Sequence, residues 1–226
     1  MKKRIPTFEI IAQEIKDHEL AVSLLSDMDE KIKSISEKIL FAFDRNKKLL
    51  ICGNGGSAAD AQHFSSELIG KYEIDRKPLS AISLSTDPSA VTAISNDYGF
   101  LDVFSRQVEG LGTKGDILLV ISSSGNSINL CNAVKTAKSM QIECIGLLGR
   151  DGGILKELLD FEITIKSYST ARIQEVHGLI IHIISKIIVY LNVKFYQKLT
   201  VIFAKIISWL QPKIGDYFYE SSKLAN

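Results

Sequence analysis

Two side chains capable of acid–base and metal chemistry lie one helical turn apart. His63 and Glu67 are four residues apart, shortly after a glycine-rich run at 53–57. In a helix this spacing places both side chains on one face. An imidazole beside a carboxylate can exchange protons with a substrate or hold a divalent ion. Either residue alone is more simply a histidine with ordinary partners or a solvated helix charge, so the pair gains weight only from its surroundings.

A second face of similar chemistry lies nearer the C-terminus. Gln174, Gly178 and His182 follow one another at intervals of four residues, so they share one helix face with a notch at the glycine. Residues eight apart are separated by about 12 Å along a helix axis. One ion could contact Gln174 and His182 only if both side chains converge over the notch or come from different subunits. Histidine nitrogens with carboxylate and amide oxygens suit a zinc-like ion.

Residues 122–127, Ser-Ser-Ser-Gly-Asn-Ser, have the composition of a phosphate-binding loop between a predicted strand and a predicted helix. The N–H groups and dipole at a helix N-terminus favour an anion, and hydroxyls add donors. The Lys-Ser/Thr ending of a triphosphate loop is absent, so the loop suits a single phosphate ester. Helix capping by Ser124 or Ser127 is the simpler alternative, although one serine would suffice for it.

The glycine-rich run has three interpretations. Residues 53–58 match the dinucleotide pattern G-x-G-x-x-A after a predicted strand. That pattern needs an acid about 20 residues later, at the end of the next strand, and Asp87 comes later than that. A loop whose backbone approaches a polar ligand is favoured, and a simple tight turn is the third possibility. Asn96 and Asp97 add polar groups that the sequence alone does not make catalytic.

Alternating strands and helices must position these residues. Two amphipathic helices are predicted within about 7–45, followed by strands at 47–52, 81–84, 117–121, 143–148 and 161–165. Helices are predicted to about residue 71, at 88–95, 102–111 and 127–140, and from about residue 170. Strands separated by helices predict a parallel sheet covered on both faces. A phosphate anchor, an acid–base pair and a possible metal on such a scaffold suggest aldose–ketose isomerisation of a sugar phosphate.

Composition excludes several classes of protein. The 226 residues carry 27 Lys and Arg against 26 Asp and Glu, which gives no electrostatic reason to expect nucleic acid or a membrane surface as partner. Three unpatterned cysteines argue for a reducing compartment, and no secretory signal is expected at the N-terminus. The apolar region 179–210 is interrupted by lysines, so helices rather than a membrane span are predicted. The interrupting residues are Lys186, Lys194, Lys198 and Lys205.

Taken together, the motifs resemble the phosphoheptose isomerase family of the sugar isomerase (SIS) fold. The resemblance runs from about residue 8 to about 193. It rests on residues 52–57 with Asp60, His63 and Glu67, on 95–100, on 121–127, and on 170–175 with His177 and His182.

The resemblance implies an α/β fold: a three-layer, flavodoxin-like sandwich with a five-stranded parallel sheet. It implies a cytoplasmic homotetramer with active sites between subunits and one zinc ion per subunit. The implied reaction converts sedoheptulose 7-phosphate to D-glycero-D-manno-heptose 7-phosphate through an enediol(ate), the first step toward activated heptose for lipopolysaccharide or capsule. By position, the zinc ligands are His63, Glu67, Gln174 and His182, and Glu67 and His182 are also the catalytic pair. The implied substrate-binding residues are Asn54, Gly55, Gly56, Asn96, Asp97, Ser122, Ser123, Ser124, Ser127 and Gln174.

The chain departs from this family in two places. Lys71 stands where some relatives carry Arg, which keeps the charge without bidentate geometry. Residues 194–226 extend past the family's usual end and predict an extra amphipathic helix, either packed on the protein or contacting a partner or membrane surface. We therefore expect an N-terminal helical segment at 1–45 for oligomer packing, an SIS domain at 46–193, and an extension at 194–226.

Two rival functions share the scaffold. One is a non-catalytic SIS-domain protein that binds a sugar phosphate or regulates. The presence of both Glu67 and His182 argues against it. The other is a different sugar-phosphate enzyme of the superfamily, such as an aminosugar phosphate isomerase or a muramic acid phosphate etherase. The motif at 170–182 favours the heptose group over it. His18 and His177 have no comparable neighbours, and we assign them structural roles.

Overall fold

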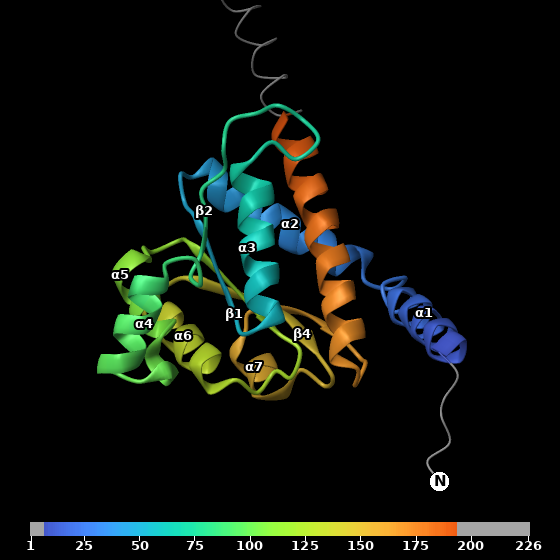
Figure 1. Cartoon of the computed structure of the whole chain (residues 1–226). Helices are drawn as coiled ribbons and strands as arrows, with labels where there is room; N and C mark the ends of the chain where they lie inside the picture. The colour runs from blue at the N-terminus through green and yellow to red at the C-terminus, as the bar shows by residue number, and fades with distance from the viewer. Residues whose placement is uncertain (1–6, 194–226) are drawn as a thin grey trace, which may run out of the picture. The chain divides into compact units, whose positions relative to one another are not determined.

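Five parallel strands form the central sheet, in the order β2-β1-β3-β4-β5 (Figure 1). The computed structural model describes residues 7–193. The order reverses direction between β1 and β3, and open α/β sheets bind ligands at the carboxyl ends beside such a point. The strands are β1 Leu49–Gly53, β2 Ala81–Ser83, β3 Ile117–Ser122, β4 Glu143–Gly149 and β5 Phe161–Ile165.

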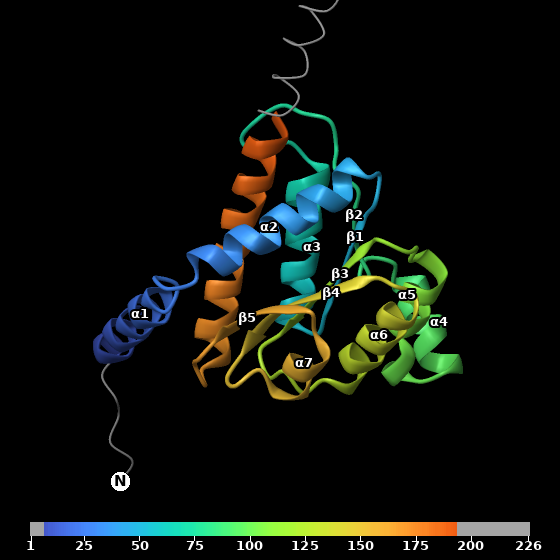
Figure 2. The ribbon, with the colours of Figure 1, turned by 180° about the vertical axis from the view of Figure 1, so that it is seen from behind.

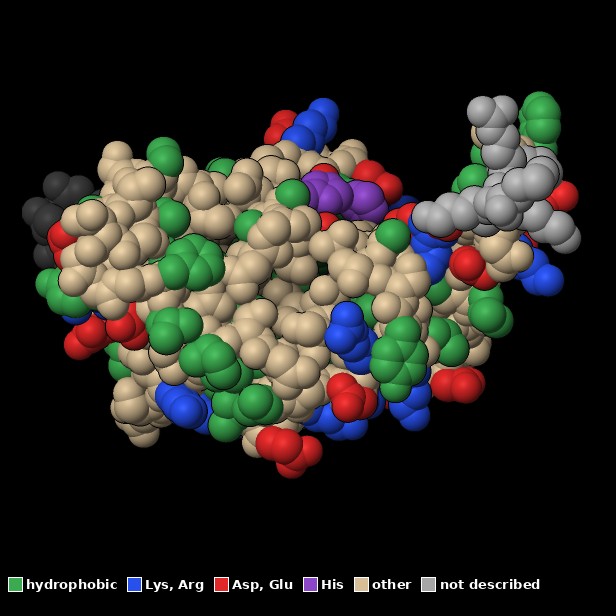
Figure 3. Space-filling view, turned by 60° about the horizontal axis from the view of Figure 1, so that its bottom comes forward, with side chains coloured by type: hydrophobic (Ala, Val, Ile, Leu, Met, Phe, Trp, Pro, Cys, Tyr) green, Lys and Arg blue, Asp and Glu red, His purple; other side chains and the backbone are tan. Residues whose placement is uncertain are grey.

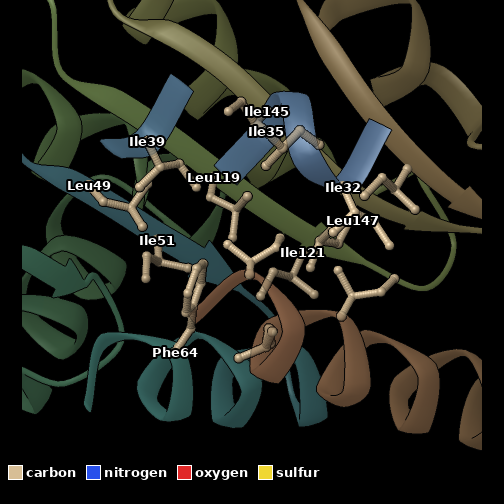
Figure 4. Close-up of a cluster of buried hydrophobic side chains, with 14 of the residues drawn as sticks. Ile32, Ile35, Ile39, Leu49, Ile51, Phe64, Leu119, Ile121, Ile145 and Leu147 are labelled. Carbon is tan, nitrogen blue, oxygen red and sulfur yellow. The ribbon is translucent and has the colours of Figure 1, made fainter. Parts of the chain in front are cut away.

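One face of the sheet is covered by α2 (Asp29–Asp44), α3 (Gly56–Ile69) and the C-terminal helix Thr170–Val193 (Figure 2). Successive strand residues point to opposite faces, so Ile51 and Leu119 enter this layer. Figure 4 shows them packed between isoleucines of α2 and Phe64 of α3.

The other face is covered by α5 (Ser105–Leu111), α6 (Ile128–Ser139) and α7 (Gly153–Leu158), with α4 (Pro88–Asp97) at the margin of the layer. Its core includes Leu118 and Val120 of β3 and Val134 of α6, all fully buried. Helices on both faces of a five-stranded parallel sheet confirm the predicted three-layer α/β fold.

Helix α1 (Thr7–Ser23) has few core contacts of its own. Ala21 is its only buried residue, whereas Phe8 is 85% exposed and Leu20 is 68% exposed. Arg172 of the C-terminal helix anchors it, because its guanidinium donates to the Glu14 side chain at 2.9 Å. An apolar helix surface left in water in this way is typical of a surface that contacts another chain.

The helix Thr170–Val193 is long and apolar enough to cross a membrane by length and composition, and it is the one such helix among residues 7–193. Half of its most apolar window is buried inside the structure. Ile173, Ile180 and Ile184 belong to the same core cluster as α2 and α3. This burial is typical of a core helix, as the lysine-interrupted sequence predicted.

The chain divides into two compact units, residues 1–188 and 189–226. Of the second unit the structure describes only residues 189–193, the end of the C-terminal helix. The extra helix predicted within 194–226 therefore lies outside the described residues.

One helix and one short turn were not predicted from the sequence. Helix α7 begins at Gly153, directly after Gly152, and both glycines have positive φ. It is only six residues long, so it has no long apolar repeat to reveal it. A 3₁₀ turn at Phe100–Asp102 precedes α5 and overlaps the predicted helix 102–111 only at Asp102, since α5 itself begins at Ser105. Strand β1 begins at Leu49 rather than at residue 47, because Lys48 is still in the preceding connection.

Candidate active site

The two predicted binding loops lie side by side at the carboxyl ends of β1 and β3. The strands pair up to Gly53 opposite Ile121, so the glycine loop and the serine loop both start at this edge. Asn54 and Asn129 join the loops through two reciprocal amide hydrogen bonds of 3.0 and 2.9 Å. Asn129 is buried, and the sequence analysis gave it no role. Its position in the first turn of a helix beside the serines was the only available signal.

Hydroxyl groups of the serine loop are only partly used inside the protein. Ser127 is the N-cap residue of α6 but makes no side-chain capping bond. Ser124 Oγ accepts from the Asn126 backbone N–H at 3.2 Å, and Ser122 Oγ accepts from Gly125 N–H at 3.1 Å. Capping of α6 therefore does not explain the serines. A hydroxyl that accepts a backbone bond still has its own proton to donate to a phosphate.

The serine loop packs against Gly152 and the first turn of α7. Gly125 has φ +69, and a Cβ there would collide with the backbone of Gly152. Leu155 N–H donates to the Gly125 carbonyl at 2.9 Å, and Ile154 N–H donates to Asn126 Oδ1 at 3.1 Å. Glycine is required at 125 because two backbones meet there.

Helix α3 and the C-terminal helix run side by side in the same direction, as both ribbon views show (Figures 1 and 2). Near the start of α3, a Cβ on Gly56 would lie 2.8 Å from Cδ of Gln174. Seven residues further along α3, His63 Nε2 lies 3.2 Å from His182 Nε2. Gln174 and His182 therefore face α3 at two different levels, separated by about 12 Å along the axis.

The helix face between Gln174 and His182 is open at Gly178. Gly178 lies midway, and a Cβ at this position would meet nothing within 4 Å. The notch predicted between Gln174 and His182 is therefore open space. Gln174 lies against the glycine loop, and its predicted part in metal binding stays a prediction.

Three ligand atoms converge where His63, Glu67 and His182 meet. They lie within 4.8 Å of one another, and His63 Nε2 is 3.0 Å from Glu67 Oε1. If His63 Nε2 carries a proton, that one N–H must be shared between Glu67 Oε1 and His182 Nε2. A divalent cation accepts lone pairs from all three atoms, and two imidazoles with a carboxylate are a donor set that zinc prefers. The group is accessible, since His182 is exposed and histidines reach the surface together in Figure 3.

Asp60 is a further ionisable group on α3 to which the sequence analysis gave no role. Its Oδ2 is buried without a hydrogen-bond partner among the described residues. Burial raises the pKa of this carboxyl to about 6, against a smaller lowering by His63. A carboxyl with a raised pKa beside such a cluster is a common feature of functional sites. Its i, i+3 spacing to His63 was the signal in the sequence.

Asn96 and Asp97 lie on α4, which packs at the other face of the sheet from α3 and the C-terminal helix. Both are exposed at the end of α4, and Asn96 Nδ2 donates to Asp97 Oδ1 at 2.8 Å. Within residues 7–193 no hydrogen bond joins either of them to His63, Glu67 or His182. His177 is fully buried and its Nε2–H donates to the Leu148 carbonyl at 3.1 Å, as expected of a structural histidine. His18 is exposed and pairs with Glu175.

Comparison with known proteins identifies the scaffold. The SIS domain family model matches residues 18–149. The phosphoheptose isomerase of Helicobacter pylori strain P12 is 49% identical over 177 residues, which are 78% of this chain and 92% of that protein. The chain belongs to the phosphoheptose isomerase family.

Solved structures of this family agree with the fold. The phosphoheptose isomerase of Neisseria gonorrhoeae is 42% identical with a TM-score of 0.77, and that of Francisella tularensis is 36% identical with a TM-score of 0.79. Each comparison covers 81% of this chain and 98% of the other. The predicted family is thereby confirmed, and the chain is an isomerase that acts on a small sugar phosphate.

Proposed function

We propose that this protein interconverts sedoheptulose 7-phosphate and D-glycero-D-manno-heptose 7-phosphate, as the first step toward activated heptose for lipopolysaccharide or capsule. The observation that carries the proposal is the convergence of Glu67 and His182 with His63 within 4.8 Å, in a chain of the phosphoheptose isomerase family. The contact of His63 with His182 joins two helices whose residues are 119 apart in the sequence.

The reaction moves one proton between neighbouring carbons. A base removes a proton from C1 of the ketose while O2 takes up a proton, which gives an enediol(ate). A proton is then returned to C2 and O1 loses its own proton, so that the C2 carbonyl is replaced by a C1 aldehyde. Glu67 and His182 are the acid–base pair in this proposal. Donors of Ser123, Ser124 and Ser127 hold the phosphate, and the backbone at Gly55 and Gly56 lets the sugar approach closely.

We propose zinc, one ion per subunit, as the metal of this site. His63, Glu67 and His182 fit it as ligands because each offers a lone pair to the same point. Gln174 is the fourth ligand expected from the family. When bound, the ion would act as a Lewis acid toward the sugar oxygens. The proton transfers themselves belong to the protein side chains.

Proton NMR of the metal-loaded protein with sedoheptulose 7-phosphate tests the activity. We expect aldose anomeric signals from the wild type and at least about a hundredfold slower turnover in Glu67→Gln, since acid–base groups contribute that much. Glu37→Gln is the matched control, because Glu37 is an exposed carboxylate on α2. Full activity of Glu67→Gln would refute its role. Bound substrate without turnover in the wild type would favour the rival, a regulatory protein that binds a sugar phosphate.

We further propose a homotetramer with active sites between subunits. The exposed apolar residues of α1, such as Phe8 and Leu20, support it because such a surface is typical of an interface. Exposed Asn96 and Asp97 are then candidates to complete the site of a neighbouring subunit. Sedimentation velocity of the full chain should give about four chains per particle; a stable monomer would contradict this. Three free, buried cysteines support a cytoplasmic location.

A further inference from the structure

A strap, defined as residues 70–79, connects the end of α3 to β2. It folds back on α3, because the Arg76 guanidinium donates to the carbonyls of Glu67 and Leu68 at 2.8 Å each. Leu79 N–H donates to the Leu68 carbonyl at 3.0 Å. The strap is therefore held to the helix that carries His63 and Glu67.

The same strap also reaches the C-terminal helix at His182. Tyr72 Oη donates to the His182 backbone carbonyl at 3.2 Å. The two rings are nearly parallel, at 17°, with centroids 6.3 Å apart. His63 contacts the His182 ring edge-on, at 4.7 Å between centroids. His182 thus has one ring neighbour from the metal-binding group and one from the strap, both within the usual range for ring pairs.

The backbone of the strap is strained at this contact. Tyr72 has φ 21 and Glu73 has φ 55, and Ile74 N–H donates to the Tyr72 carbonyl across Glu73. This three-residue turn with positive φ at a residue other than glycine is rare and costs energy. An ion pair compensates, since Lys186 Nζ lies 3.2 Å from Glu73 Oε1 one turn beyond His182. The strap therefore contacts the C-terminal helix at two successive turns.

We infer that Tyr72 is a positioning residue that holds the exposed imidazole of His182 toward His63 and Glu67. The inference deepens the proposed function, because it concerns the acid–base group of that site. An exposed histidine has several accessible rotamers, and ordering it costs conformational entropy. On this inference, the nearly parallel Tyr72 ring favours the His182 rotamer that faces His63 and Glu67. Groups that orient ligands in this way are worth about 10–100-fold in metal affinity or activity.

Three variants separate the ring, the hydroxyl and general effects. Tyr72→Ala removes the ring and the hydrogen bond, and Tyr72→Phe removes only the hydrogen bond. Tyr168→Ala is the control, because Tyr168 is 83% exposed and lies outside the strap. The measurements are kcat and KM for sedoheptulose 7-phosphate, the Kd for zinc by competition with a chelator, the Tm, and the crystal structure around His182.

For Tyr72→Ala we expect kcat to fall and the zinc Kd to rise by about tenfold or more, with KM within about twofold of wild type. Tyr72→Phe should retain most of the wild-type kcat and zinc affinity, and Tyr168→Ala should change neither kcat nor the zinc Kd. A Tyr72→Ala protein with unchanged kcat, zinc Kd and His182 rotamer would overturn the inference. So would a fall in Tm with a raised KM and an unmoved His182, which indicates a purely structural role.

Different outcomes would refute the isomerase function and the positioning role of Tyr72. A wild type that does not turn over sedoheptulose 7-phosphate refutes the function, whereas a displaced His182 in Tyr72→Ala would still support the positioning role. An active wild type with an unaffected Tyr72→Ala variant refutes only the positioning role.

Discussion

Among residues 7–193, hydrogen-bond capacity that is not fully used inside the protein supports the residues that we propose to bind a ligand. In the serine loop, Ser127 makes no capping bond and Ser124 uses only its acceptor side. In the acid–base group, three lone-pair atoms face one another. Buried or aligned polar groups normally find partners within the protein. The serine hydroxyls and the three converging atoms are therefore our candidates for binding a phosphate and a metal ion.

Ser124→Ala should weaken substrate binding without unfolding the protein. Loss of one hydroxyl donor to a charged phosphate is worth about 1.5 kcal/mol, so KM should rise about tenfold. Ser139→Ala at the other end of α6 is the control, since its hydroxyl only bonds the carbonyl of Thr136 in its own helix. Steady-state kinetics of the two variants make the comparison, and an unchanged KM in Ser124→Ala would argue against the phosphate loop.

Two parallel helices, α3 and the C-terminal helix, set the distances within the site. Near the start of α3, Gly56 faces Gln174, and about two turns later His63 faces His182. The open notch at Gly178 lies between these levels. A sugar phosphate with its phosphate on the serine loop and its reacting carbons at His182 would need this space.

Substitutions at Gly178 test the notch. Gly178→Ala should stabilise the protein by about 0.5–1 kcal/mol, because glycine is unfavourable inside a helix and the added Cβ meets no atom. Gly178→Leu should instead raise KM several-fold, since a large side chain fills the space. Gly110 in α5 is a matched control, because its Cβ position is also open. Equal KM values for Gly178→Leu and Gly110→Leu would show that substrate does not use the notch.

The whole molecule is stabilised by two apolar layers, and a histidine lies inside one of them. His177 is fully buried, and burial lowers the pKa of its imidazole to about 4, against a smaller raising by the bond to Leu148. His177 Nε2–H donates to that carbonyl, and Nδ1 has no partner among the described residues. The folded protein therefore holds a neutral imidazole that the unfolded chain would protonate below its ordinary pKa of about 6.5.

Stability should consequently fall as the pH drops from about 6.5 toward 4. In this window the unfolded state binds a proton that the folded state does not, so the free energy of unfolding rises with pH. The full effect is up to about 3 kcal/mol, because one pKa unit corresponds to about 1.4 kcal/mol. Urea unfolding of wild type and His177→Met between about pH 7 and 5 measures it. The variant should be less stable at pH 7 but show a shallower slope; parallel slopes would contradict the assignment.

Patterns among neighbouring residues predicted most of the helices and strands. They also predicted the separate helix faces and loops from which the site is built. The apolar strands, the i, i+4 spacing of His63 and Glu67, and the polar loops after two strands are properties of near neighbours in the sequence. Such periodicity reports secondary structure and the face of a helix directly. The predicted parallel sheet followed from the alternation of elements, and the family from the order of the motifs.

Tertiary packing decided which of these residues meet. His63 and His182 are 119 residues apart, and their contact depends on how two helices are aligned on one sheet face. The same alignment places Gln174 against Gly56, at a different level from His182. Burial of Asp60, the amide pair of Asn54 and Asn129, and the contact of Tyr72 with His182 are likewise long-range. The sequence by itself therefore determined the chemical groups and their helix faces, whereas packing on the sheet determined their partners, because side-chain spacing along one helix contains no information about the offset of another.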